Sequence, residues 1–346
     1  MKHDVPVNVV IVGCGQMARN HIGRIMPRFK NTHVSVVCEP SMESYEETSE
    51  LFKGNGRPVP PNEPDLARLL AEYGEQIDVA FIITPHVFHY RQAKLCMEAG
   101  LDVLLEKPMV MNVVEANELI ETRDRTGRLL VVAFQGSLSP QIRKAVAMIH
   151  SGELGSIRNI SGVTWQDWAA SQAGKWREQP EVSGGGFMFD TGAHMLNTVA
   201  DLAGEEFTDI AAFFENQKSP VEVAAVIMGR LESGILVTIN GCGDTAPSCN
   251  SDIRVFCTNA VLRTGSWGER LEILKEQSKP YSDSRESGWE KVDVPESRGV
   301  WEEFLATRDG SISNPSPPEL GLRMARLWDA IKESASQDGA PVRIDH

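Results

Sequence analysis

The chain has 346 residues, of which 41% are hydrophobic and 24% are charged, and its formal net charge is −14. This length suits two globular domains, each with its own apolar core. The negative charge would repel nucleic-acid phosphates and anionic membrane surfaces, so we expect neither as a partner. The sequence shows no apolar run of membrane-spanning length and no signal-peptide pattern, so we expect a cytoplasmic protein.

The six cysteines lie at positions 14, 38, 96, 242, 249 and 257. They form no CxxC pair, and no His follows at the spacing of metal ligands, so we expect no metal site. Cys14, Cys38 and Cys96 fall in apolar segments and are expected to be buried. Cys242 and Cys249 flank a turn and could pair, although reduced thiols are favoured in a cytosolic enzyme.

Residues 1–134 alternate short apolar runs with segments of helical periodicity. The runs, which are typical of strands buried on both faces of a parallel sheet, cover residues 7–12, 34–38, 79–83, 103–105 and 129–134. The helical segments cover residues 16–28, residues 87–99, and a helix between Asn112 as N-cap and Gly127 as C-terminal stop. Residues 53–64 are rich in Pro and Gly and predict a surface loop. This alternation predicts a doubly wound α/β domain.

The pattern changes near Ser139, and residues 135–346 predict a second domain. A helix is expected from Pro140 to Gly152, with further helices over residues 191–203 and 319–334. The strand-like segments cover residues 157–165, 210–215, 221–228, 235–240 and 253–257. Several of these alternate apolar and polar residues, which predicts a mostly antiparallel sheet with one buried face in an α+β domain.

A glycine-rich turn, GxGxxA, separates the first strand from the first helix. Its first glycine allows a tight turn, its second lets the backbone approach a pyrophosphate, and its alanine permits close packing of helix on strand. The helix N-terminus then offers N–H groups to the phosphates. The residues expected to bind a dinucleotide here are Gly13, Gly15, Gln16, Met17 and Ala18.

Glu39 ends the second predicted strand. A carboxylate at this position can accept hydrogen bonds from both ribose hydroxyls of NAD and would repel the 2′-phosphate of NADP. The next residues, Pro40 and Ser41, supply no basic group that could hold such a phosphate. We therefore predict NAD as the cofactor, the alternative being an exposed Glu at a helix start.

Lys107 directly follows a predicted strand, within the sequence Glu106-Lys107-Pro108. Ligands of open α/β sheets bind outside the carboxyl ends of the strands, so this lysine is expected to face the cofactor crevice. There it could hold a substrate hydroxyl or exchange a proton with it. On local sequence alone, an ordinary surface lysine is the favoured interpretation.

Asp190 and His194 are four residues apart at the start of a predicted helix, which would place them on one face. A carboxylate beside an imidazole fixes its tautomer and raises its basicity. His194 is then a candidate general base for the oxidation of an alcohol. The alternative, held equally open, is that Asp190 is an N-cap and His194 a core residue with satisfied hydrogen bonds.

The chain resembles the glucose–fructose oxidoreductase/inositol dehydrogenase (Gfo/Idh/MocA) family over nearly its whole length. Four motifs carry the resemblance in the family's order: GCGQMA (13–18), TPHVFH (84–89), EKP (106–108) and GGGFMFDTGAH (184–194). The resemblance implies an N-terminal Rossmann domain and a C-terminal domain with a large open sheet. It also implies that the free face of this sheet forms a homodimer or homotetramer.

The resemblance implies further that Lys107, Asp190 and His194 are the catalytic residues and that the turn after the strand at 79–83 lies near the cofactor. Many relatives carry Arg after the strand at 129–134, whereas this chain has Gln135, which weakens the case for an acidic or phosphorylated substrate. The residues expected at the cofactor, besides those named above, are Thr84, Pro85, His86, His89, Glu106, Lys107, Gln135, Trp176 and Arg177.

Two segments that contain tryptophan, Trp165-Gln166-Asp167-Trp168 and Lys175-Trp176-Arg177, lie between the predicted sheet and the candidate catalytic helix. Aromatic faces with nearby polar groups suit a sugar or cyclitol ring. Ordinary core or rim tryptophans are an equally good interpretation for each, and Trp176 is favoured because relatives often carry a similar Trp-Arg pair near the cofactor. The expected substrate-binding residues are Lys107, Trp165, Asp167, Trp176, Asp190 and His194.

These observations predict an NAD-dependent oxidoreductase that transfers a hydride between a secondary hydroxyl of a sugar, polyol or sugar derivative and the nicotinamide. No metal is needed, because Lys107 can polarise the oxygen as zinc does in other dehydrogenases. Some relatives instead use transient oxidation to eliminate a glycosidic bond, so an NAD-dependent glycosidase remains an alternative. A second alternative is a nucleotide-binding regulator without catalysis. Whether NADH accumulates when a glycoside is cleaved would separate the two enzymes, and NAD binding without turnover across a broad sugar panel would favour the regulator.

Overall fold

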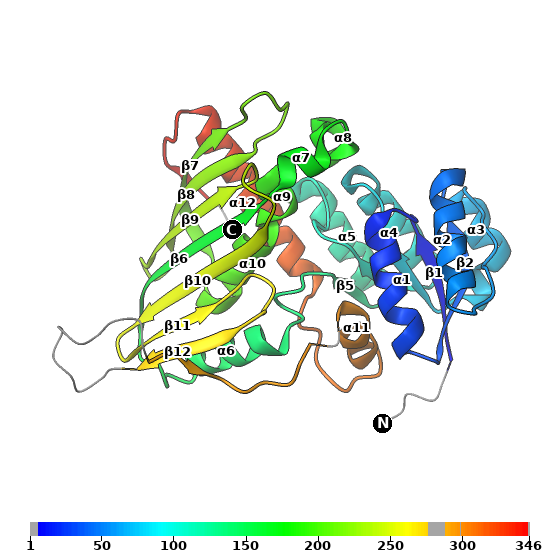
Figure 1. Ribbon diagram of the computed structural model, residues 1–346, viewed down its shortest axis with the longest axis horizontal. Coiled ribbons are helices and arrows are strands. Elements are labelled where there is room, and N and C mark those ends of the chain that lie inside the picture. Colours follow the sequence, from blue (N-terminus) through cyan, green and yellow to red (C-terminus); the bar gives the residue numbers. More distant parts are fainter. Residues whose placement is uncertain (1–5, 276–287, 298, 345–346) are drawn as a thin grey trace. The chain divides into compact units, whose positions relative to one another are not determined.

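The structure is a computed structural model that describes residues 6–275, 288–297 and 299–344. The chain divides into two compact units (Figure 1). The N-terminal unit comprises Met1–Ala133 and Arg298–Leu322, and the C-terminal unit comprises Phe134–Ser297 and Arg323–His346.

The N-terminal unit contains a five-stranded sheet in which every pair of neighbouring strands is parallel. Its order is β2-β1-β3-β4-β5: β2 lies on one side of β1, and β3 to β5 follow on the other side. The switch point of the strand order, where ligands of such sheets bind, therefore lies between β1 and β3. The strands are almost wholly buried, as expected when helices cover both faces. Their bounds are β1 (Val7–Val12), β2 (Thr32–Cys38), β3 (Val79–Ile82), β4 (Asp102–Leu105) and β5 (Leu130–Val132). The predicted doubly wound α/β fold is confirmed.

Helices connect these strands. Their bounds are α1 (Gln16–Arg28), α2 (Met42–Gly54), α3 (Leu66–Tyr73), η1 (Gly74–Gln76), η2 (His86–Phe88), α4 (His89–Glu98) and α5 (Val113–Thr126). The predicted ends of α5 are confirmed, because Asn112 Oδ1 accepts a bond from the Glu115 N–H and Gly127 is left-handed with φ +65°. The sequence did not predict α2, because its buried side includes Thr48 and Ser49 and so lacks an apolar period.

A late segment of the chain returns to the N-terminal unit, although the sequence had placed all of residues 135–346 in the second domain. This segment contains α11 (Val300–Arg308). Trp301 Nε1 donates to Thr32 Oγ1 at 3.0 Å, and its ring stacks on that of Phe81 with centroids 6.0 Å apart. Arg308 Nε donates to Asp102 Oδ2 at 2.9 Å. The helix therefore buries its aromatic side against the parallel sheet.

The C-terminal unit contains a nine-stranded sheet of order β13-β12-β11-β10-β6-β9-β8-β7-β14. All neighbours are antiparallel except β6 and β9, which run parallel, so the predicted mostly antiparallel sheet is confirmed. The strands are β6 (Ile157–Gln166), β7 (Phe207–Glu215), β8 (Ala224–Leu231), β9 (Leu236–Cys242), β10 (Cys249–Cys257), β11 (Ala260–Thr264), β12 (Leu271–Lys275), β13 (Glu290–Lys291) and β14 (Val342–Arg343). The strand predicted over 221–228 begins only at Ala224.

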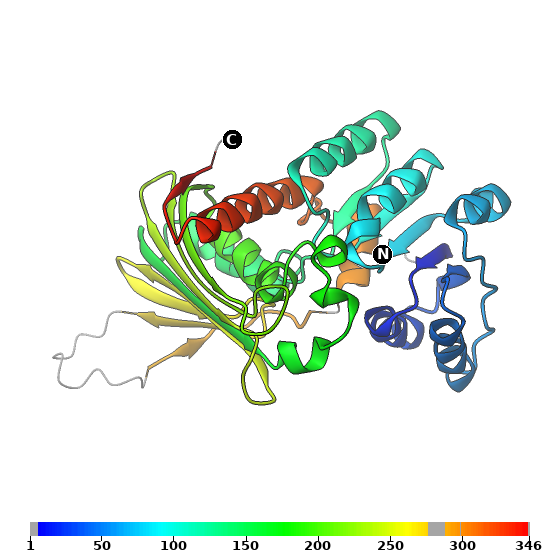
Figure 2. The same ribbon diagram turned by 90° about the horizontal axis from the view of Figure 1, so that it is seen from above.

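Helices cover one face of this sheet (Figure 2). The helices of the unit are α6 (Pro140–His150), α7 (Trp168–Gln172), η3 (Trp176–Glu178), α8 (Pro180–Ser183), α9 (Phe187–Asp190), α10 (Gly192–Ala203) and most of α12 (Pro318–Ser336). Helix α10 is buried along nearly its whole length, and Trp328 of α12 stacks on Phe189 of α9 with ring centroids 5.0 Å apart. The core of the unit thus lies between the sheet and α10.

The opposite face of the nine-stranded sheet, called the outer face below, carries large apolar side chains that are exposed. Along β8 and β9 buried and exposed residues alternate, as expected when one face packs on a core. Its exposed apolar residues are Phe213, Val226, Met228, Leu236 and Phe256. Among the residues that the structure describes, no helix is both long and apolar enough to cross a membrane.

Candidate active site

The glycine-rich turn has the geometry that a dinucleotide requires. Gly13 is left-handed with φ +92°, and a Cβ there would lie 2.7 Å from the Ile83 carbonyl oxygen, so the turn needs this glycine. Gly15 has no such need: its φ is −66°, and a Cβ there would meet no atom within 4 Å. Within the described chain, no side chain caps the N-terminus of α1, and no acidic residue lies in its first turn. The N–H groups at the start of α1, which no side chain caps, and the open space beside Gly15 fit the pyrophosphate of a dinucleotide.

Glu39 lies at the end of β2 and is 8% exposed. Its Oε2 accepts a hydrogen bond from the Cys14 N–H at 2.6 Å, and its Oε1 accepts one from the Ser41 N–H at 2.7 Å. These bonds join the carboxylate to the glycine-rich turn and fix its orientation. Each carboxylate oxygen has further lone pairs that could accept ribose hydroxyls.

Lys107 follows β4 and is half-buried. The neighbouring Glu106 is bonded through Oε1 to His21 Nε2 of α1 at 2.7 Å, while its Oε2 accepts the Lys107 N–H at 3.1 Å. The His21 ring in turn packs against Phe81 of β3, with centroids 4.9 Å apart. Glu106 thus ties the turn that carries Lys107 to the helix that follows the glycine-rich turn.

His89 holds the other side of this turn. It is fully buried, with Nδ1 2.8 Å from the Pro108 carbonyl oxygen and Nε2 2.9 Å from the Thr84 carbonyl oxygen. Burial lowers the pKa of His89, whereas its two carbonyl partners favour the protonated ring. Since both ring nitrogens bond the backbone, the geometry favours a supporting role over contact with the cofactor. His86, also buried, lies with its ring centroid 5.7 Å from that of His89.

Asp190 is buried at the end of α9, in the C-terminal unit. Its Oδ2 accepts bonds from Trp168 Nε1 at 2.9 Å and from Arg177 Nε at 2.8 Å. The guanidinium of Arg177 also lies over the ring of Trp176, 4.3 Å from its centroid. Asp190 thus binds two residues of the segment between β6 and α8, and the expectation that it orients His194 stays a prediction.

His194 lies in the first turn of α10 and is 7% exposed. Its ring makes an edge-on contact with Phe134, with centroids 6.4 Å apart, and a tilted contact with Trp267 at 5.7 Å. Just before the helix, Thr191 Oγ1 donates to Gln166 Oε1 at the end of β6 at 2.7 Å. Together with Asp190, these contacts place the start of α10 beside the end of β6.

The remaining predicted residues of this unit lie around the same segment. Trp165 and Asp167, at the end of β6, are half-buried, as is Trp176 in η3. Gln135 is also half-buried, on a turn that packs closely on α10, because a Cβ at Gly136 would lie 2.2 Å from Thr198 Oγ1. The contacts of these residues with cofactor or substrate stay predictions.

Three residues that support the site were not assigned by the sequence. His21 gave no local signal, because its partner Glu106 is 85 positions away. Trp168 lies in one of the two tryptophan segments, but the sequence left its role open between sugar stacking and core packing, whereas its indole N–H binds Asp190. Glu222 is buried and accepts bonds from the backbone N–H groups of the segment that leads to Asp190. A carboxylate inside the apolar run 221–228 was the available signal.

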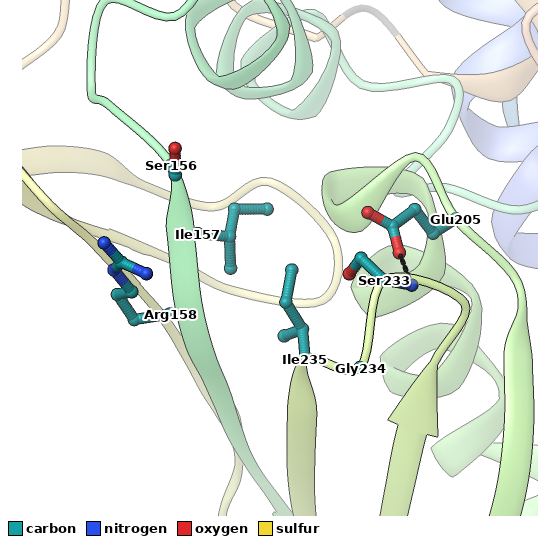
Figure 3. A pocket seen from close by; sticks show the side chains of 7 residues that line it. All are labelled: Ser156, Ile157, Arg158, Glu205, Ser233, Gly234 and Ile235. Carbon is teal, nitrogen blue, oxygen red and sulfur yellow. Dashed lines mark hydrogen bonds between the residues drawn. The ribbon is translucent and has the colours of Figure 1, made fainter.

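A separate hollow of about 460 Å³ lies at the other end of β6 (Figure 3). Its lining includes Arg158 and Glu205, and Glu205 Oε2 accepts the Ser233 N–H at 2.8 Å. Ile157 and Gln166 are nine residue steps apart along the strand, about 30 Å at the usual rise per residue. This hollow is therefore distinct from the candidate active site.

Comparison with known proteins places both parts of the chain in one family. Residues 7–134 match the family described as "Oxidoreductase family, NAD-binding Rossmann fold" (GFO/IDH/MocA). Residues 142–263 match the GFO/IDH/MocA C-terminal domain.

Curated relatives include a 1-carboxy-3-chloro-3,4-dihydroxycyclohexa-1,5-diene dehydrogenase of Comamonas testosteroni, which is 29% identical over 140 residues, 40% of this chain and 34% of that protein. The D-glucoside 3-dehydrogenase of Escherichia coli is 26% identical over 200 residues, 58% of this chain and 54% of that protein. The aligned stretches thus span about a third to a half of these two relatives.

Solved structures share the whole fold at low identity. A levoglucosan dehydrogenase in complex with NADH and levoglucosan superposes with a TM-score of 0.82 at 22% identity, covering 98% of this chain and 99% of that chain. The WlbA dehydrogenase from Bordetella pertussis, in complex with NADH and UDP-GlcNAcA, gives a TM-score of 0.80 at 21% identity and covers 99% of each chain. The fold, the NAD-binding turn and the two family matches agree: this chain belongs to the GFO/IDH/MocA oxidoreductase family, with NAD as its cofactor.

Proposed function

We propose that this protein is an NAD-dependent dehydrogenase that oxidises a secondary hydroxyl of a sugar, polyol or sugar derivative, reversibly. The observation that carries the proposal is that one chain combines a glycine-rich turn at an uncapped helix N-terminus with Lys107, Asp190 and His194, each of which is joined to neighbouring residues by a hydrogen bond or a ring contact. The names of its relatives agree in class, since they include a glucoside dehydrogenase and a levoglucosan dehydrogenase.

The cofactor is assigned to the N-terminal unit. The N–H groups at the start of α1 would hold the pyrophosphate, and Gly15 leaves room for it. Glu39 would accept the hydroxyls of the adenosine ribose, and its negative charge would disfavour the 2′-phosphate of NADP. When bound, NAD supplies the two-electron acceptor for the oxidation.

Lys107 and His194 are assigned to the substrate hydroxyl. The imidazole of His194 takes the hydroxyl proton as general base. The amine of Lys107 donates a hydrogen bond to the same oxygen and stabilises the negative charge that develops there as the proton leaves. The proposal therefore requires these two side chains to reach one substrate oxygen.

Asp190 is assigned a supporting role in this chemistry. Its carboxylate binds Trp168 and Arg177, so it can fix the segment between β6 and α8 around a bound sugar. Half-buried Trp165 and Trp176 offer ring faces on which the C–H face of a sugar can stack.

The outer face is assigned to self-association as a homodimer or homotetramer. Phe213, Val226, Met228 and Leu236 expose apolar surface on neighbouring strands β7, β8 and β9. Apolar patches of this kind mark sites of protein association.

All six cysteines are free thiols, which agrees with a reducing compartment such as the cytoplasm.

A panel of sugars, polyols and glycosides, followed by NADH absorbance, tests the proposal. The protein is checked first for bound NAD, and NAD is then supplied in excess. We expect NADH to accumulate with at least one sugar or polyol. Cleavage of a glycoside without NADH accumulation would instead support the redox-cycling glycosidase. NAD binding without turnover across the panel would support a regulator.

A further inference from the structure

Glu222 provides every hydrogen-bond acceptor at the start of the short helix α9. Its Oε2 accepts the Gly186 N–H at 2.7 Å, and its Oε1 accepts the N–H groups of Met188 at 3.1 Å and Phe189 at 3.4 Å. Its backbone carbonyl accepts the remaining one, from Phe187, at 2.9 Å. The first bond within the helix follows at once, from the Asp190 N–H to the Gly186 carbonyl.

This arrangement explains how a helix of four residues persists. The first N–H groups of a helix have no partner within it, and a single turn gains too little from its own bonds to be stable alone. Here one residue from the β7–β8 connection satisfies all of them. The approach is so close that a Cβ on Gly186 would lie 2.1 Å from the Glu222 carbonyl oxygen.

The same connection also reaches the partner of Asp190. Val223, the next residue, accepts the Gly243 N–H at 2.7 Å through its carbonyl. The Gly243 carbonyl in turn accepts the backbone N–H groups of Trp168 at 2.9 Å and of Ala169 at 2.8 Å. Residues 222–223 therefore anchor both the helix that ends in Asp190 and the segment whose indole binds the Asp190 carboxylate.

We propose that Glu222 is a positioning residue for the reaction: it fixes the turn of Asp190 and thereby the segment between β6 and α8 that the Asp190 carboxylate holds around the substrate. This rests on the proposed function. Glu222 itself is 4% exposed and its carboxylate binds backbone N–H groups, so it acts through Asp190 and not on the substrate.

The test compares Glu222→Gln with a matched control, Glu205→Gln. Glu205 is another carboxylate of the same unit that accepts a backbone N–H, at the distant hollow of Figure 3. An amide at position 222 would direct its NH₂ group at N–H donors and lose part of the cap. We expect kcat to fall about 10²-fold in Glu222→Gln, the loss that a small displacement of a reacting group can cause. NADH affinity should be unchanged, as should all parameters of Glu205→Gln.

Hydrogen exchange gives a readout that does not depend on turnover. In Glu222→Gln, we expect faster amide exchange in the peptides that contain residues 184–190 and 165–172, with the rest of the C-terminal unit unchanged. If Glu222→Gln does not fold, Glu222→Asp, which keeps the charge on a shorter side chain, is measured in the same way. The proposal is overturned if the folded variant keeps the wild-type kcat, or if exchange at these two peptides does not change. A wild-type protein without turnover would refute the proposed function, and the exchange result would still decide the placement of the turn.

Discussion

In the N-terminal unit the cofactor turn is built from backbone groups, whereas in the C-terminal unit the candidate acid–base segment is held by side chains. Gly13 shapes the first, Gly15 leaves open space beside it, and one carboxylate, Glu39, joins it to the sheet. Asp190 depends on a tryptophan and an arginine, and Glu222 caps the turn before it. The first construction follows from a short sequence pattern, while the second needs residues that are distant in the chain.

The largest expected effect separates chemistry from cofactor binding. Replacing Lys107 by Met should lower kcat about 10³-fold, because the hydrogen bond to the reacting oxygen is lost. NADH affinity should remain, since the turn at α1 is untouched. Steady-state rates and fluorescence titration with NADH measure the two. The control is Lys53→Met, an exposed lysine that bonds Glu50. A Lys107 variant with the wild-type rate would contradict the assignment.

The next effect concerns Glu39, the carboxylate that is bonded to the glycine-rich turn of the N-terminal unit. Glu39→Ala should weaken NAD binding and narrow the preference over NADP about 10-fold to 100-fold, since hydrogen bonds to a charged group contribute about 1.5–3 kcal/mol. Titration with both cofactors tests this, with Glu50→Ala on α2 as the control. An unchanged ratio of the two dissociation constants would show that Glu39 does not face the ribose.

Two tryptophan variants test the side-chain contacts that hold Asp190 in the C-terminal unit. Trp168 and Trp301 are 1% and 3% exposed, and each donates an indole N–H, the first to Asp190 and the second to Thr32 Oγ1 in the N-terminal unit. Both changes to Phe should destabilise the fold by about 2–4 kcal/mol, because each removes an indole hydrogen bond and leaves a cavity where the second ring packed. Only Trp168→Phe should also lower kcat, by about 10-fold. Equal kcat values in the two variants would argue against a role for the Asp190 environment.

The last prediction concerns how the stability of the fold depends on pH, which is measured without turnover. Burial raises the pKa of Glu222 to about 7 against the opposing effect of its hydrogen bonds, above the 4.5 of a Glu side chain in the unfolded chain. The folded state therefore binds the proton more tightly, and Glu222 contributes stability below pH 4.5 that is lost as the pH rises through about 7. The change is on the order of 3 kcal/mol. Urea titrations between these pH values should show this slope in the wild type and its loss in Glu222→Gln. A variant that keeps the slope would place its origin elsewhere.

The features that the sequence predicted are those set by neighbouring residues, and the features that it missed depend on residues far apart in the chain. The glycine spacing and the apolar runs predicted the parallel sheet and its turn, because each depends on neighbouring residues. The residues that support the candidate catalytic residues could not be predicted in this way, since His21 and Glu106 are 85 positions apart and Glu222 and Gly186 are 36 apart. Helix α11 was missed as part of the first unit for a similar reason: its partner Thr32 is 269 positions away.

The most direct test is a crystal structure of the protein with NADH and a ligand found by the substrate panel. We predict that Lys107 Nζ and one ring nitrogen of His194 both lie within hydrogen-bonding distance, about 3 Å, of the same ligand oxygen. A complex in which that oxygen contacts neither group, or in which the two groups bind different parts of the ligand, would contradict the proposed chemistry.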